Sequence, residues 1–95
     1  MTAQEFNAKY KKHIPEGWYG LGFNIPTITE MLDEEIGKIC EKWGDQFEIH
    51  QIKLKFNMPR VYTNLNEIAG REESMIEQEI EKKIAVLLKE YDSKK

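Results

Sequence analysis

The stretch QFEIHQIKLKF, at positions 46–56, constrains the fold of this chain most, because its apolar residues alternate with polar ones as in a half-buried β-strand. The alternation changes parity near His50-Gln51, which indicates either a β-bulge there or a strand that begins later. A turn at 57–59 and a short return strand at 60–63 are expected to follow. A two-stranded hairpin is marginally stable in water by itself, so one of its faces must pack on other elements of the chain.

Helical periodicity on both sides of the hairpin indicates what those elements are. Apolar residues recur at helical spacing from Ile28 to Trp43, after the capping-box pattern Thr27-Ile28-Thr29-Glu30. A second apolar stripe runs from 71 to 91, with glutamates at its start and lysines at its end, as suits a helix dipole. The pattern Thr2-Ala3-Gln4-Glu5 predicts another capped helix near the N-terminus. Residues 64–71 are expected to be a connector with room for one helical turn.

These elements predict an α+β fold, with about three helices packed on a small antiparallel β-hairpin. The alternative is a wholly helical bundle, in which the strand at 46–56 is misassigned. The 95 residues suit a single domain. It comprises an N-terminal helix and turn (1–16), then a glycine- and aromatic-rich loop, a helix and the hairpin (17–63), then the connector and the long C-terminal helix (64–95). In the loop, Trp18, Tyr19 and Phe23 are expected to cover the core.

Composition excludes several classes of site. Cys40 is the single cysteine, so no intramolecular disulfide can form, and its helical position predicts a small core residue. Neither histidine lies at metal-ligand spacing from it, and we see no catalytic triad or paired acids, so we expect no metal, no cofactor and no enzyme activity. No apolar run is long enough to span a membrane or to serve as a signal peptide. We therefore expect a cytoplasmic protein without a membrane partner.

Charge is unevenly distributed along this acidic chain, whose net charge is −3. The hairpin carries Lys53, Lys55 and Arg60 against Glu48 alone. Lys53 and Lys55 share one face of their strand, and Arg60 shares a face with Tyr62 on the return strand. If the register of the two strands aligns these pairs, they form a patch that would suit a phosphate, an acidic protein surface or a single-stranded nucleic acid. It is equally typical of a solvated sheet face whose charges discourage edge pairing.

The segment 65–81 is acidic, with six acids and one base. Its candidate binding residues are Glu73, Glu77 and Glu79. Glu73 and Glu77 project toward the apolar side of their predicted helix, and a buried carboxylate there requires a partner. That partner is either Arg60, through a bidentate pair, or water, if the first turns of the helix overhang the core.

The hairpin sequence QIKLKFNMPRVY, at 51–62, resembles a motif of small uncharacterised phage and prophage proteins, approximately Q-x-K-E-K-F-G-x-L-R-F-Y. An upstream Gly17-Trp18 pair, a helix at 27–43 and a long helix after the hairpin add to the resemblance. Leu54, Asn57 and Pro59 depart from the motif, and the cysteine-containing end of many members is absent. The resemblance implies a phage origin and no known activity. It nominates Lys53, Lys55, Arg60 and Tyr62.

Two functions are consistent with these features. The first is a small protein-binding modulator, phage-encoded and directed at a host protein in the host cytoplasm, with the acidic segment meeting a basic partner. The alternative is a module that binds nucleotides or single-stranded nucleic acid on the basic hairpin face. The amphipathic C-terminal helix could pack within the domain or form a homodimer.

Overall fold

The computed structural model describes residues 1–73 and 75–93, apart from the side chains at 71–73. Within this part of the chain, the helices are α1 (Ala3–Lys9), α2 (Pro26–Trp43), α3 (Leu65–Glu73) and α4 (Met75–Ser93). Short 3-10 helices span Lys11–His13 and Gly44–Gln46. The strands are β1 (Gly20–Leu21), β2 (Ile49–Lys55) and β3 (Met58–Thr63), in the sheet order β1-β2-β3. The predicted α+β class is confirmed, and the wholly helical alternative is wrong.

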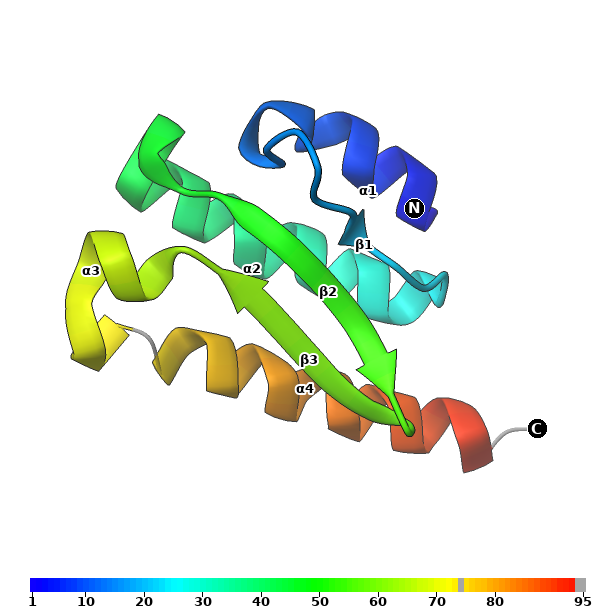
Figure 1. Cartoon of the computed structure of the whole chain (residues 1–95). Helices are drawn as coiled ribbons and strands as arrows, with labels where there is room; N and C mark the ends of the chain where they lie inside the picture. Colours follow the sequence, from blue (N-terminus) through cyan, green and yellow to red (C-terminus); the bar gives the residue numbers. More distant parts are fainter. Residues whose placement is uncertain (74, 94–95) are drawn as a thin grey trace.

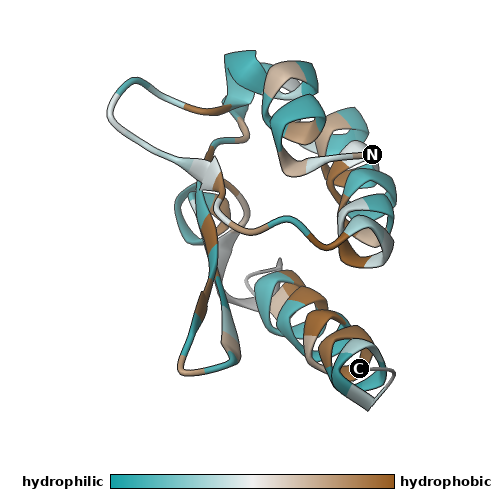
Figure 2. Cartoon of the chain, turned by 90° about the vertical axis from the view of Figure 1, so that its right-hand side faces the viewer, coloured by the Kyte–Doolittle hydropathy of each residue, from teal (hydrophilic) through white to brown (hydrophobic). Residues whose placement is uncertain are grey.

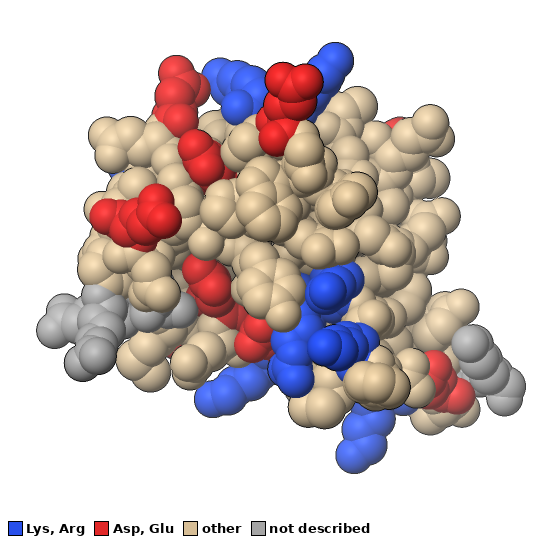
Figure 3. Space-filling view, in the orientation of Figure 1, with Lys and Arg blue, Asp and Glu red and all other residues tan. Residues whose placement is uncertain are grey.

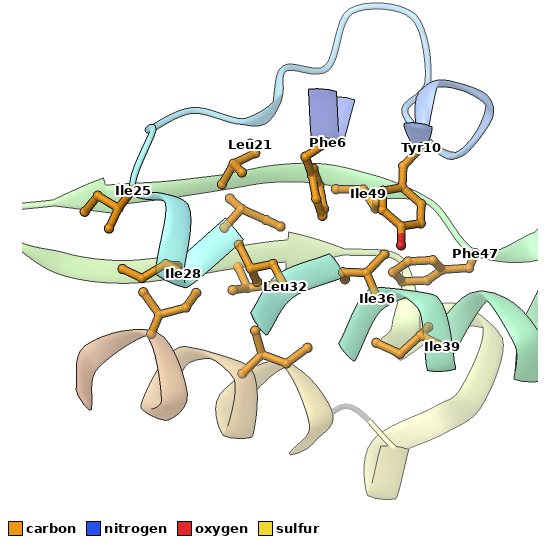
Figure 4. Close-up of a cluster of buried hydrophobic side chains, with 14 of the residues drawn as sticks. Phe6, Tyr10, Leu21, Ile25, Ile28, Leu32, Ile36, Ile39, Phe47 and Ile49 are labelled. Carbon is orange, nitrogen blue, oxygen red and sulfur yellow. The ribbon is translucent and has the colours of Figure 1, made fainter. Parts of the chain in front are cut away.

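Helices α2 and α4 cover one face of the sheet, and α1 lies beside β1 (Figure 1). Figure 2 shows the same arrangement with the sheet nearly edge-on and the helices on one side of it. The core fills the space between these layers, and Figure 4 shows its side chains converging from the strands and the helices. Fully buried members include Phe6, Ile28, Leu32, Ile36, Phe47, Ile49, Ile52, Leu65 and Ile84. Among the described residues, no helix covers the opposite face of the sheet (Figure 1).

The hairpin has the predicted alternation and the predicted irregularity. Strand β2 pairs antiparallel with β3, and the register shifts between Ile49 and Gln51, which confirms the β-bulge. The turn lies at Phe56-Asn57, one residue earlier than predicted, and both residues have positive φ, 54° and 61°. Phe56 is therefore at the tip of the hairpin and not on the apolar face of the strand.

Strand β1 was not predicted, because two residues are too few for an alternation pattern. Gly20 and Leu21 pair parallel with Gln51 and Ile52 of β2. The segment before β1 does not cover the core as expected. Trp18 and Tyr19 are exposed, and Phe23 alone of the three aromatic residues packs against the core.

Two helix boundaries differ from the prediction. Thr2 and Glu5 form the predicted capping box of α1, whereas the second capping box does not form. Helix α2 begins at Pro26, since proline suits the first helical position, where its missing N–H costs no hydrogen bond. The predicted connector lies in helix α3, which has a non-helical kink at Gly70, and the helix expected at 71–91 falls on the last residues of α3 and on α4.

Side chains close both edges of the sheet. At the β1 edge, the Asn7 amide donates to the carbonyl of Leu21 (3.0 Å) and accepts from its N–H (2.8 Å). At the β3 edge, Pro59 has no N–H, and the N–H of Val61 donates to Oε2 of Glu81 (2.8 Å). Strand addition from another chain is therefore disfavoured at Leu21, Pro59 and Val61, and we call the sheet face opposite the helices the open face.

Candidate binding surface on the open face of the sheet

The open face is built by the outward positions of the hairpin. Register places Gln51 opposite Tyr62, Lys53 opposite Arg60, and Lys55 opposite Met58. We call these six residues the hairpin face. Figure 3 shows this side of the molecule, with Lys and Arg side chains gathered near the lower centre and acidic side chains above and to the left. The predicted patch of Lys53, Lys55, Arg60 and Tyr62 is thus brought together on one surface.

Within the hairpin face, a cation and an aromatic ring are already paired. Nζ of Lys53 lies 5.6 Å from the centroid of the Tyr62 ring, in a cation–π contact. Tyr62 remains 44% exposed. The contact holds the ring beside the cations and leaves much of it available to a ligand.

A second exposed aromatic residue lies beside the hairpin face, on the β1 side. The Trp18 ring stacks on the imidazole of His50, with centroids 4.6 Å apart and planes 15° apart, and is 47% exposed. The backbone N–H of Tyr19 donates to the carbonyl of His50 (3.2 Å), which holds the loop against β2. Nε2 of His50 lies 3.2 Å from Oε1 of Glu48. Sequence patterns missed Trp18 as a surface residue, because aromatic loop residues more commonly cover a core.

The end of the hairpin is apolar and exposed. Phe56 is 91% exposed and Met58 is 54% exposed. Beside them, a groove of about 300 Å³ runs between β3 and α4. Its lining residues are Met58, Pro59, Arg60, Gln78, Glu81, Lys82 and Ala85. Arg60 belongs both to the hairpin face and to this groove, so the two surfaces are continuous.

The acidic candidates do not form one site. The side chain of Glu73 lies outside the described residues, and Glu79 is exposed on α4. Oε1 of Glu77 accepts a hydrogen bond from the hydroxyl of Thr63, a partner that is neither Arg60 nor water. Burial raises the pKa of the Glu77 carboxyl, since desolvation disfavours its charged form. Glu77 is therefore engaged with β3 at the edge of the sheet and is a weak candidate for binding a partner.

Other reactive groups are dispersed in the described part of the chain. No three His, Cys, Asp or Glu residues there lie close enough to hold a metal ion. Cys40 is half-buried against the core, and burial raises the pKa of its thiol, which disfavours the reactive thiolate. Among the described helices, none has both the length and the apolar character needed to cross a bilayer.

Comparisons of the chain with models of protein families, with curated proteins and with solved structures gave no significant match. The phage-like character of the hairpin motif therefore stays a prediction.

Proposed function

We propose that this protein binds another protein through the hairpin face and Trp18. The observation that carries the proposal is a sheet face that no described helix covers, on which the exposed Tyr62 ring lies among three cations and the exposed Trp18 ring stacks on His50. Trp, Tyr and Arg are the residues most enriched at the energetic centres of protein interfaces. The cations favour a partner with an acidic surface, since complementary charge speeds association and sets orientation. A host protein modulated by a phage-encoded chain is the setting that the hairpin motif suggests.

The acidic segment is a weaker candidate for the binding surface than the hairpin face. Glu77 and Glu81 both accept hydrogen bonds from β3, so these two carboxylates are already engaged within the fold. Glu67 and Glu79 are exposed, but they lie on different helices, α3 and α4. An isolated surface charge contributes little binding free energy by itself. This distribution supports a partner that is acidic and not basic.

Affinity capture from extracts of the cells that carry the gene, treated with nuclease, tests the proposal. The wild type is compared with the double variant Lys53→Glu/Arg60→Glu. The control is Lys11→Glu/Lys12→Glu, which makes the same charge change at two exposed positions of the N-terminal 3-10 helix. We expect one stoichiometric protein with the wild type and the control, and its loss with the hairpin variant. Equal capture by all three proteins would show that the hairpin face is not the site.

A single-stranded nucleic acid or a nucleotide is the second candidate ligand. The observation in its favour is that Trp18 and Tyr62 offer stacking surfaces beside Lys53 and Arg60, as in non-specific single-strand binders. Fluorescence anisotropy with a labelled oligothymidylate tests it. If three cations contact phosphates, the logarithm of the binding constant should fall against log salt with a slope of about −2. Absent or salt-independent binding would remove this candidate.

A further inference from the structure

The tip of the hairpin carries a residue that the turn itself does not favour. Phe56 and Asn57 have φ angles of 54° and 61°, which a two-residue type I′ turn requires at both central positions. Asparagine followed by glycine is the favoured pair there, because a side chain with a Cβ is strained at positive φ. Phe56 is also 91% exposed, so burial in the core does not offset this strain. An interaction outside the chain would account for a large apolar side chain at this position.

The groove between β3 and α4 lies beside that tip. Met58 connects the two, since it follows the turn directly and lines the groove. Pro59 and Ala85 give the groove an apolar floor, and Arg60 and Lys82 lie along it. Glu81 is the acidic residue in the lining, and its Oε2 is held by the N–H of Val61. Lys53 and Lys55, on the neighbouring strand, continue the positive charge across the hairpin face.

We propose that Phe56 and this groove bind an acidic, amphipathic peptide segment of the partner protein. Apolar side chains of the segment pack against Phe56 and Met58, and its carboxylates pair with Arg60 and Lys82. Pro59 lacks an N–H and the N–H of Val61 is engaged, so the segment is held by side chains and not as an added strand. The inference rests on the proposed function and specifies the chemistry of the partner.

Selection from a displayed library of random 16-residue peptides, with the wild-type protein as bait, tests this inference. The selected peptides are then titrated against four variants. Phe56→Asn removes the aromatic anchor and replaces it with a residue that the turn favours. Asn57→Gly changes the same turn and keeps Phe56. Ala85→Glu places a negative charge in the groove, and Val86→Glu makes a matched charge change on the neighbouring position of α4, outside the groove.

The expected peptides combine aspartate or glutamate with aliphatic or aromatic residues. They should bind at least tenfold more weakly to Phe56→Asn and to Ala85→Glu, and within twofold of wild type to Asn57→Gly and Val86→Glu. Urea denaturation should give midpoints for Phe56→Asn and Asn57→Gly at or above that of the wild type, so that a loss of binding is not a loss of folding.

Three outcomes would overturn the inference. One is peptides without acidic residues, or no peptides at all. Another is peptides that bind Phe56→Asn and the wild type equally. If Lys53→Glu/Arg60→Glu still failed to capture the partner protein in that case, the proposed function would stand, and only the role of Phe56 as an anchor would be wrong. The third is a Phe56-dependent affinity for oligothymidylate, for anionic phospholipid vesicles or for a second copy of the chain, which would assign the tip to another class of ligand.

Discussion

Asn7 does with one side chain what a further strand would do. Its amide group both donates to and accepts from the backbone of Leu21, as a residue of a neighbouring strand would. Replacement with alanine leaves a partly buried N–H and a partly buried carbonyl without these partners. Each buried polar group without a partner costs about 1–3 kcal/mol, so we expect Asn7→Ala to lower the free energy of unfolding by about 2–3 kcal/mol. Asn66→Ala, at an exposed position of α3, is the control for urea denaturation, and an equal effect of both variants would contradict the role of Asn7.

Glu77 makes stability depend on pH in a direction opposite to that of most carboxylates. Burial raises its pKa above the ordinary value of 4.5, so between the two values the folded state binds more protons than the unfolded state. The contribution of the Glu77 carboxyl to the free energy of unfolding is therefore fully present at low pH. It is lost as the pH rises through the raised pKa. Glu77→Gln cannot ionise and keeps an acceptor for the hydroxyl of Thr63.

We therefore expect Glu77→Gln to be more stable than the wild type at pH 7, with the advantage shrinking toward pH 4. Urea denaturation of both proteins across this range measures the difference. Glu5 and Asp33, whose pKa values are lowered in the fold, are present in both proteins, so their contribution cancels. A difference that is constant with pH would mean that Glu77 does not titrate in this way.

At the scale of elements, Gly70 kinks helix α3. Its backbone has φ 79° and ψ −175°, a conformation that is essentially restricted to glycine. A Cβ at this position would meet no atom within 4 Å, so the cost of a substitution comes from the backbone and not from a clash. We expect Gly70→Ala to lower the free energy of unfolding by about 1–3 kcal/mol.

Gly37 provides the contrast within α2. A Cβ there would lie at an ordinary contact distance, 3.5 Å from the Tyr10 hydroxyl oxygen. Alanine is favoured over glycine inside a helix by about 1 kcal/mol, so Gly37→Ala should stabilise the protein. Thermal unfolding of both variants tests the pair, and a midpoint shift of the same sign for both would contradict the kink at Gly70.

The elements that the sequence predicts well are those whose pattern repeats. The alternation around Ile52 identified β2 and its bulge, and the apolar stripes identified α2 and α4. Strand β1 has two residues, and its pairing depends on contacts with β2 that are distant in sequence. Helix α3 was mistaken for a connector, since its exposed polar residues obscure the helical period. The start of α2 was placed too late because Thr27 offered a hydroxyl, whereas Pro26 begins the helix.

The candidate site was also predictable only where its residues belong to a repeating pattern. Strand alternation paired Lys53 with Lys55 and Arg60 with Tyr62, and the register of the structure brings the two pairs onto one face. Trp18 and Phe56 could not be assigned, because an aromatic residue in a loop or turn gives no periodic signal that separates burial from exposure. The groove depends on how α4 packs against β3, which no local pattern contains.

At the scale of the whole molecule, the closed edges predict how chains associate. Wild-type protein should not associate by strand pairing, so its sedimentation coefficient should be independent of concentration. The double variant Pro59→Val/Glu81→Ala restores an N–H at Pro59 and frees that of Val61 at the β3 edge. We expect its weight-average mass to rise with concentration in sedimentation equilibrium. A rise in the wild type as well would point to another dimer surface, such as α4.

The position of Glu81 in the sequence determines when the β3 edge is covered during synthesis of the chain. Residue 81 follows the hairpin in the sequence, so a chain emerging from the ribosome presents β3 before Glu81 can cover it. Until α4 is made and docked, the nascent hairpin offers an edge that a neighbouring nascent chain could extend. A longer delay between the synthesis of these two segments therefore leaves this edge of β3 uncovered for longer.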